Sequence, residues 1–274
     1  MNSDSGDRVF SGSIAQLYEQ YLVPLIFEVY AKDMTRRLVE LRPSAVLEIA
    51  AGTGVVTRQM SALLPPDVSI VATDLNQPML EHAMSIGTSR AVTWKQADAM
   101  SLPFDDCTFD AVVCQFGAMF FPDKATAFAE ARRVLRPGGT FLFNVWDRIE
   151  DNEFADCVTQ AMADLFPDDP PRFLARLPHG YCDQRIITAA LFEGGFKGTN
   201  AFDVVTAQSP ADSSRAVAIA YCQGTPLRNE IDARDTEILS KATDIATAAI
   251  GARFGAGPVT GKIQAIVVSA ARDA

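Results

Sequence analysis

The sequence predicts an α/β fold: an open, mostly parallel sheet with helices on both faces. Between residues 45 and 147, short apolar runs alternate with segments of helical periodicity. Strands that alternate with helices in this way form parallel sheets covered by their crossover helices. The chain has 274 residues, with 48% hydrophobic and 21% charged residues. That length and composition allow a substantial core without disulfides or metal.

The elements of the first half follow in order. Residues 57–64 carry Met60, Leu63 and Leu64 at helical spacing, and Pro78 suits the first turn of a helix at 77–85. A third helix is expected at 124–135, where Arg136–Gly139 stops it and turns the chain into a strand. The expected strands are 45–50, 68–73, 91–97, 109–116 and 140–146.

After Trp146 the pattern loosens. Residues 148–182 are rich in Asp, Pro and Phe and are expected to form a lid. The remaining expected elements are a helix at 184–196, a strand at 198–208, a mostly helical stretch at 210–253 and a final strand at 262–270.

One sheet with two helical insertions explains this order better than two independent domains. We therefore expect a single domain over residues 1–274. Its core would comprise about 32–147, 184–208 and 259–274, with an N-terminal cover at 1–31 and cap insertions at about 148–183 and 209–258.

Charge and hydropathy exclude several classes of protein. The chain has 34 acidic against 24 basic residues, a net charge of −10, which disfavours a protein that binds nucleic-acid backbones. No apolar run reaches the roughly 18 residues needed to span a bilayer. The N-terminal segment is polar and lacks an apolar signal core. We expect a cytoplasmic protein with neither a nucleic-acid nor a membrane partner.

Cysteine and histidine usage argues against a metal site. The five cysteines are odd in number and widely spaced, so they form no disulfide framework or zinc pattern. Only two histidines are present, too few for a histidine-rich site. We expect no bound metal.

The first candidate site is the run Glu48–Gly54, which follows a strand and precedes a helix. Small residues in such a turn let the backbone approach a ligand closely. Asp74 ends the next strand, where a carboxylate can accept hydrogen bonds from both hydroxyls of a ribose. This pair indicates a nucleotide-like ligand, although a tight turn beside an acidic strand end would show the same residues.

A dinucleotide site is the first alternative, because its fingerprint G-x-G-x-x-G also follows a strand. Counting from Gly52, the third glycine position holds Thr57. This mismatch weakens the interpretation as a nicotinamide-dependent oxidoreductase.

Three further segments complete a pattern: Gln96–Phe104 after the third strand, Phe109–Val113 in the fourth and Leu135–Gly139 before the fifth. Together with Glu48–Gly54, they resemble the class I S-adenosylmethionine-dependent methyltransferases, in the small-molecule branch that includes quinone-ring methylases. The resemblance is strong over roughly residues 44–147. It implies a Rossmann-like, seven-stranded, mostly parallel sheet in the order 3-2-1-4-5-7-6, with the last strand antiparallel, flanking helices and a helical cap.

The resemblance also implies a role for each matching residue. The turn 50–54 would cradle the methionine part of the cofactor, and Glu48 would support its amino group through water or backbone. Asp74 would bind the ribose, with Leu75 against the adenine.

Asp98 would bind the adenine amino group, helped by the backbone of Ala97 and Ala99, although it could instead cap the following turn. Gln115 would lie by the methionine moiety, or be an ordinary polar residue at a strand end. The implied cofactor-binding set is Tyr21, Glu48, Ala50, Ala51, Gly52, Gly54, Asp74, Leu75, Met79, Ala97, Asp98, Ala99 and Gln115.

One position departs from the family's commonest pattern, which has glycine where this chain has Ala50. We expect the alanine to be tolerated if its φ is negative.

The acceptor side is less specific. Methyl transfer from a sulfonium is an in-line displacement that needs alignment and exclusion of water rather than a metal. Tyr18, Phe116 and Phe120 are candidates to line a dry acceptor pocket, with core or helix packing as the alternative. His179, in the expected lid, is the candidate general base, or else a histidine that faces solvent or orders the loop.

The sequence thus predicts methyl transfer from S-adenosylmethionine to a small organic acceptor, at oxygen, carbon or nitrogen. Three alternatives remain: a nicotinamide-dependent oxidoreductase, a non-catalytic S-adenosylmethionine-binding module, and a nucleic-acid or protein methylase. The acidic charge opposes a nucleic-acid substrate, and the chain has no Asn-Pro-Pro-Tyr motif.

Overall fold

A computed structural model describes residues 16–235, 237–255 and 257–273. They divide into two compact units. The sheet unit comprises residues 28–145, 181–205 and the described residues from 265 onward, and the helical unit comprises 146–180, 206–264 and the described part of 1–27. The first 15 residues of the expected N-terminal cover lie outside the described residues.

The sheet has seven strands in the order β3-β2-β1-β4-β5-β7-β6, which confirms the predicted order. The pairs β1–β2, β1–β4, β2–β3 and β4–β5 are parallel. Gly138 N donates to the Arg272 carbonyl at 2.9 Å, and Arg272 N donates to the Gly139 carbonyl at 2.8 Å, so the end of β7 lies beside the start of β5, as in an antiparallel pair. The strands are β1 Ala45–Glu48, β2 Ser69–Asp74, β3 Thr93–Gln96, β4 Phe109–Gln115, β5 Leu135–Trp146, β6 Ala201–Ala211 and β7 Val259–Ala271.

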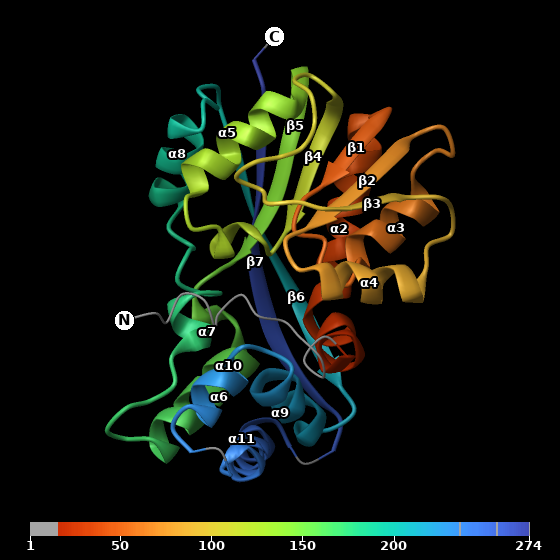
Figure 1. Cartoon of the computed structure of the whole chain (residues 1–274). Helices are drawn as coiled ribbons and strands as arrows, with labels where there is room; N and C mark the ends of the chain where they lie inside the picture. Colours follow the sequence, from red (N-terminus) through yellow and green to blue (C-terminus); the bar gives the residue numbers. More distant parts are fainter. Residues whose placement is uncertain (1–15, 236, 256, 274) are drawn as a thin grey trace. The chain divides into compact units, whose positions relative to one another are not determined.

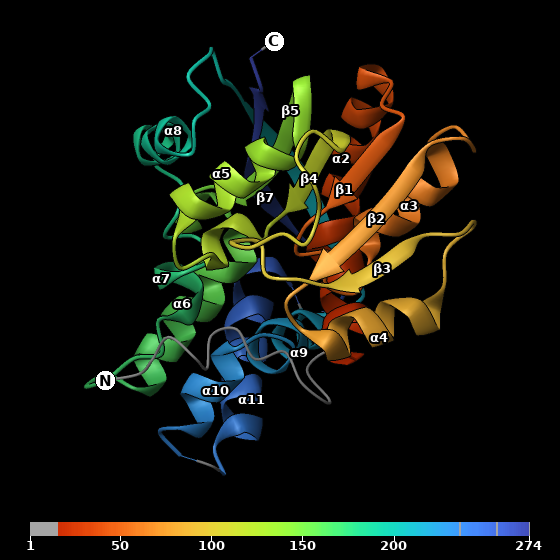
Figure 2. The same cartoon turned by 45° about the horizontal axis from the view of Figure 1, so that its top comes forward.

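Helices cover the sheet in the sheet unit (Figures 1 and 2). Helix α2 packs against α3, and α5 packs against α8. Asp123 starts α5 by accepting a hydrogen bond from Thr126 N at 2.9 Å, as an N-cap residue does. The helices of this unit are α2 Glu28–Leu41, α3 Val55–Leu63, α4 Gln77–Ile86, η3 Ala118–Phe120, α5 Lys124–Val134 and α8 Gln184–Glu193.

The central strands β1 and β4 are almost wholly buried, as expected for parallel strands covered on both faces. Their neighbours in the sheet, β2 and β5, are also buried where they approach their carboxyl ends. The carboxyl ends of these strands and the loops that follow them are therefore where polar groups can meet a ligand.

The segment Leu135–Gly139 was expected as a turn before the fifth strand, but β5 already begins at Leu135. Leu135 pairs with Phe109 and Thr140 with Ala111, so four residues of β5 stand opposite Asp110 alone. This bulge is held by Arg136, whose guanidinium lies 2.6 Å from the Asp110 carboxylate.

The helical unit contains helices that pack on one another, with α11 against both α9 and α6 (Figure 1). The lid expected at 148–182, as part of a helical cap insertion, contains η4, α6 and α7. In α6, Phe154, Val158 and Met162 recur at every fourth position and are all buried. The flanking Asp and Pro residues obscured this spacing in the sequence. The helices here are η2 Tyr18–Phe27, η4 Ile149–Asp151, α6 Glu153–Leu165, α7 Phe173–Arg176, α9 Ser214–Gln223, α10 Leu227–Asp232 and α11 Leu239–Phe254.

Among the helices that the structure describes, none combines the length and apolar character needed to cross a bilayer.

Candidate functional site

The turn after β1 lies between the carboxyl ends of its two neighbouring strands. Ile49 N donates to the carbonyl of Val113 in β4 at 2.9 Å, and Ala51 N donates to the carbonyl of Thr73 in β2 at 2.9 Å. Gly54 N then closes the turn on Ala51 O at 2.9 Å. These bonds fix the backbone of residues 50–54 at the edge of the sheet where open α/β proteins bind ligands.

Gly54 requires glycine for two reasons. Its φ is +81°, and a Cβ atom there would lie 3.0 Å from the Trp94 ring and 3.1 Å from Ala83 Cβ. The absent side chain thus lets the turn pass close to α4 and β3 as it enters α3.

Ala50 has a φ of +54°, so the condition under which the alanine was expected to be tolerated, a negative φ, is not met. The position has the left-handed backbone that glycine adopts at least cost, which explains the family's preference for glycine. The methyl group fits because residue 117 is glycine: a Cβ atom on Gly117 would lie 2.5 Å from Ala50 Cβ. The Ala50 methyl group therefore occupies the space beside Gly117.

Asp74, at the end of β2, holds two loops with one carboxylate. Its Oδ2 accepts from Gly52 N at 2.8 Å, and its Oδ1 accepts from Asn76 N at 2.8 Å. The side chain is 7% exposed, and this burial raises its pKa, against the opposing effect of the backbone donors. A carboxylate has about four lone-pair sites in total, and the two short bonds occupy two of them, so two sites remain for a diol; the contact from Asn76 Nδ2 to Oδ1 is long, at 3.4 Å.

Glu48 lies at the end of β1 and is fully buried beneath the turn. The Thr57 hydroxyl donates to Glu48 Oε2 at 2.5 Å. Burial raises the Glu48 pKa to about 8, and the nearby Asp74 adds to the rise, while the bond from Thr57 and the charge of Arg58 oppose it. Glu48 and Asp74 therefore form a coupled acidic pair under one short loop.

The loop after β3 joins the same region, because Ala97 N donates to the Asp74 carbonyl at 3.0 Å. Asp98 Oδ1 accepts from Met100 N at 2.9 Å, so Asp98 caps the following turn, as the alternative to binding adenine predicted. That bond uses one of its two carboxylate oxygens. Ala99 is buried beside it.

Leu75 and Met79 differ in exposure. The Leu75 side chain is 48% exposed next to Asp74, although it is apolar. Met79 is buried, and its Cε lies 3.8 Å from where a Cβ on Gly52 would be. Leu75 could cover a flat apolar ligand, whereas Met79 packs against the turn at Gly52.

At the end of β4, Gln115 is half-buried and Phe116 is buried. Phe116 has a φ of +50° and packs edge-to-face on Tyr30, with ring centroids 5.3 Å apart. Phe116 thus packs in the core, which is the alternative to the predicted role of lining an acceptor pocket. Phe120, in η3, is half-buried, and its acceptor-side role stays a prediction.

Three predicted residues, Tyr18, Tyr21 and His179, belong to the helical unit. Tyr18 stacks on Phe27 with ring centroids 4.9 Å apart, and Tyr21 is half-buried. Phe27 in turn lies 6.0 Å from the Trp146 ring, which lies 5.8 Å from the His179 ring. These contacts form a row of four rings, which we call the aromatic row: Tyr18, Phe27, Trp146 and His179.

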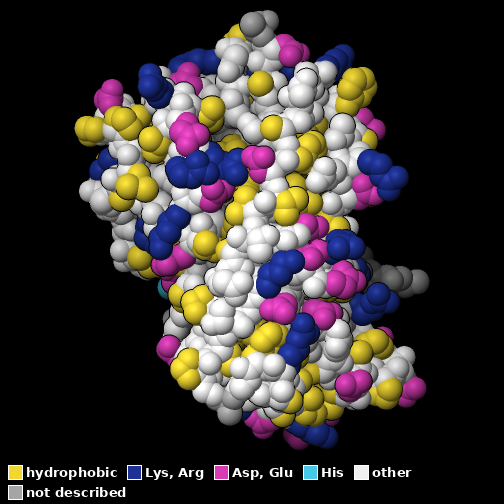
Figure 3. Space-filling model, turned by 180° about the vertical axis from the view of Figure 1, so that it is seen from behind, with side chains coloured by type: hydrophobic (Ala, Val, Ile, Leu, Met, Phe, Trp, Pro, Cys, Tyr) yellow, Lys and Arg dark blue, Asp and Glu magenta, His cyan; other side chains and the backbone are white. Residues whose placement is uncertain are grey.

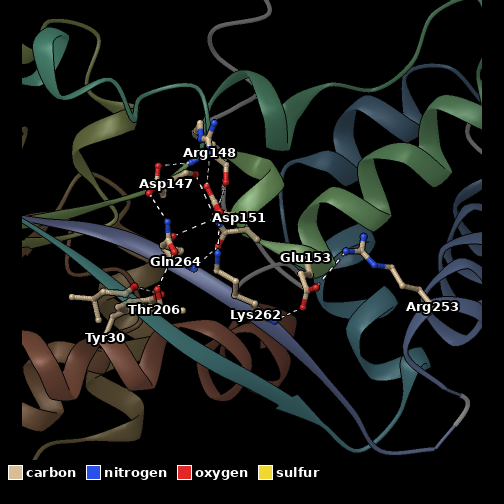
Figure 4. Close-up of polar contacts among 11 residues, drawn as sticks. Tyr30, Asp147, Arg148, Asp151, Glu153, Thr206, Arg253, Lys262 and Gln264 are labelled. Atoms are coloured by element: carbon tan, nitrogen blue, oxygen red, sulfur yellow. Dashed lines mark hydrogen bonds and ion pairs between the residues drawn. The ribbon is translucent and has the colours of Figure 1, made fainter.

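His179 is buried rather than displayed on a loop, with 7% of its surface exposed. Its Nδ1 lies 2.8 Å from the Asp147 carbonyl, so Nδ1 carries the proton and Nε2 is the basic nitrogen. Burial lowers its pKa to about 4, against the opposing effect of the Asp147 carbonyl. Gln264 fixes Asp147 by donating to its Oδ2 at 2.8 Å (Figure 4). The imidazole is therefore neutral near pH 7 and has one orientation.

Sequence reasoning missed two contributors to this site. Thr57 was considered only as a mismatch to a glycine motif, yet it donates to Glu48. Asn144 was not singled out, although it is the one polar side chain in the interior of the apolar run 141–145. Among the described residues, no cluster of three or more His, Cys, Asp or Glu side chains could hold a metal ion.

Comparisons with known proteins agree with this geometry. A family described as "Methyltransferase domain" matches residues 47–143. The ubiquinone/menaquinone biosynthesis C-methyltransferase UbiE of Pseudomonas aeruginosa strain LESB58 is 34% identical over 164 residues, which cover 55% of this chain and 64% of the relative. The chain thus spans a little under two thirds of that relative. The protein of the same name from Marinomonas sp. is 32% identical over 170 residues, covering 57% of this chain and 68% of the relative.

Solved structures share the fold. Phosphoethanolamine N-methyltransferase 2 of Haemonchus contortus, in complex with phosphomonomethylethanolamine and S-adenosylhomocysteine, superposes with a TM-score of 0.57 at 15% identity, covering 98% of this chain and 60% of that chain. The YcgJ protein of Bacillus subtilis gives a TM-score of 0.55 at 20% identity, covering 90% of this chain and 99% of that chain. With the sequence matches and the geometry of the turn after β1, these results show that the chain belongs to the class I S-adenosylmethionine-dependent methyltransferase family.

Proposed function

We propose that this chain transfers a methyl group from S-adenosylmethionine to a small organic acceptor. One observation carries the proposal: the Asp74 carboxylate receives Gly52 N and thereby ties the loop after β1 to the loop after β2. The two groups expected to meet the ribose and the methionine part of one ligand are thus held together before any ligand binds.

The residues present fit this cofactor. Two glycines with positive φ, Gly52 and Gly54, open the turn for close approach of a ligand. Asp74 would accept from the ribose hydroxyls, Leu75 would cover the adenine, and Asp98 would accept from the adenine amino group with its second oxygen. The cofactor, when bound, supplies a methyl group already activated on a sulfonium, so the protein has to position the acceptor and exclude water.

The UbiE relatives, named for ubiquinone and menaquinone biosynthesis and for C-methylation, make a quinone-type ring carbon the first acceptor to test. His179 would serve as a base only for an acidic acceptor, since its pKa of about 4 makes it a weak one.

A small acceptor also agrees with the charge of the chain. Acidic residues outnumber basic ones, and on the face drawn in Figure 3 the two kinds are interspersed rather than separated. A groove for nucleic acid would be expected to show a basic stripe.

Calorimetry tests the cofactor, and mass spectrometry tests the transfer. We expect S-adenosylmethionine and S-adenosylhomocysteine to bind much more tightly than NAD. Incubation with S-adenosylmethionine and a panel of quinols, phenols and amines should add 14 mass units to one class. Tighter binding of NAD would favour the oxidoreductase alternative. Cofactor binding without any methylated product across the panel would favour a non-catalytic binding module.

A further inference from the structure

Asn144 lies in the middle of the most buried stretch of the sheet. Its neighbours Phe143 and Val145 are fully buried, and so is the asparagine itself. A buried side-chain amide is costly unless its donors and acceptors are paired, and an apolar residue of the same size would pack at lower cost. The asparagine therefore needs a reason other than stability.

Its carbonyl oxygen binds the backbone where β4 leaves the sheet. Phe116 N donates to Asn144 Oδ1 at 2.8 Å and also to the Asn144 main-chain carbonyl at 3.2 Å. The amide nitrogen Nδ2 is buried and has no hydrogen-bond partner among the described residues. The Asn144 oxygen Oδ1 thus accepts from Phe116 N, while the two N–H groups of Nδ2 have no partner among the described residues.

The residue that Asn144 binds has a strained backbone. Phe116 has a φ of +50°, a conformation that aromatic residues rarely adopt. The next residue, Gly117, abuts the Ala50 methyl group, and a Cβ atom there would also lie 2.8 Å from Cys114 Sγ. The turn after β4 is therefore fixed by Asn144 on one side and by the turn after β1 on the other.

From this geometry we infer that Asn144 is a positioning residue for the cofactor. It holds Phe116 at its left-handed φ of +50°, which keeps the next residue, Gly117, against Ala50 of the 50–54 loop. The inference rests on the proposed function, because it takes that loop as the methionine end of the cofactor site. Without the Oδ1 acceptor, Phe116 would relax toward a negative φ, and the turn would move against Ala50.

The test compares Asn144→Leu and Asn144→Ala with Val145→Ala, a change at the next buried position of the same strand. We expect the two Asn144 variants to bind S-adenosylhomocysteine roughly 2- to 12-fold more weakly by calorimetry, the effect expected when one hydrogen bond that holds the turn is lost. Asn144→Leu should keep its melting temperature, because it removes the unpaired amide. Val145→Ala should lower the melting temperature and leave the affinity unchanged. Asn144→Ala, which cannot overpack the core, gives the result if Asn144→Leu does not fold.

A second comparison separates positioning from general damage. Glycine adopts a φ of +50° without strain, so in a Phe116→Gly background the Asn144→Leu change should alter the affinity by less than about twofold. Folded Asn144 variants that bind S-adenosylhomocysteine as tightly as the parent would overturn the inference and leave the proposed function standing. A parent chain that does not bind S-adenosylhomocysteine would overturn both.

Discussion

The Asp74 carboxylate offers the sharpest test of the cofactor site, because its two oxygens already have known partners. Replacing Asp74 with alanine removes the acceptors of Gly52 N and Asn76 N, each at 2.8 Å. It also removes the two oxygens that we assign to the ribose hydroxyls. The variant should therefore change stability and cofactor affinity together, by amounts that can be measured separately.

The two magnitudes follow from the bonds lost. An unpaired buried donor costs about 1–3 kcal/mol. Gly52 N and Asn76 N lie in loops, so water can bind them in the variant and reduce this cost. The removal of the buried Asp74 charge reduces the cost further. We expect a loss of about 1–3 kcal/mol of unfolding free energy, or roughly 2–10 °C in melting temperature. Two hydrogen bonds from ribose to a charged acceptor are worth about 1.5–3 kcal/mol, so the dissociation constant for S-adenosylhomocysteine should rise roughly 10- to 150-fold.

Asn76→Ala is the matched control. It keeps the Asn76 N–H bond to Asp74 and removes only the long contact from Nδ2 to Oδ1 at 3.4 Å. Its stability and its affinity should both stay close to those of the parent. If Asp74→Ala is folded at the assay temperature and its dissociation constant for S-adenosylhomocysteine is unchanged, the ribose lies elsewhere and the reasoning fails.

Two further predictions concern the same loops. Because the Glu48 pKa is raised to about 8 in the fold, its protonated form stabilises the protein at low pH. That stability should be lost as pH rises from about 4.5 to 8, and Glu48→Gln should flatten this decline in urea unfolding; equal declines in the two proteins would mean that Glu48 is ionised throughout. Gly117→Ala should cost about 1–3 kcal/mol of unfolding free energy by overpacking against Ala50, and adding Ala50→Gly should recover part of that cost; strictly additive effects in thermal melts would show that the two positions are not coupled.

The sheet could be predicted from the sequence because its signals are local. Strands β1, β2, β4 and β5 each contain a short apolar run beside a helix with its own periodicity, and strand order came from the family resemblance. The bulge at Arg136–Gly139 could not be predicted in this way, because it depends on the pairing of β5 with Asp110 in another strand. The bounds of helix α6 within the expected helical cap were not predicted, because polar flanks concealed its buried face.

The candidate site shows the same difference between residues with a local sequence signal and residues that depend on a contact elsewhere in the fold. Glu48, Gly52, Gly54 and Asp74 could be predicted as site residues from their type, their position relative to a strand end and the family resemblance. Thr57 and Asn144 were not predicted, because their importance depends on a specific contact, of Thr57 with Glu48 and of Asn144 with Phe116, that their own local patterns do not reveal. The bond from Phe116 to Asn144 spans 28 residues and joins two strands whose alignment no local pattern reveals.

Ala50 departs from the family motif, and the effect of this departure depends on the residue that its methyl group contacts, Gly117. From the sequence alone, the methyl group raised doubt about close approach of the cofactor. In the structure, the backbone at Ala50 still has the glycine-like φ of +54°, and the methyl group lies against Gly117. The backbone of the turn thus keeps the conformation a ligand needs, and the cost of a left-handed alanine, about 1–2 kcal/mol, falls on stability. An alanine at position 50 is therefore compatible with the cofactor only while position 117 is glycine, so relatives that share the alanine should also lack a side chain at the position matching 117.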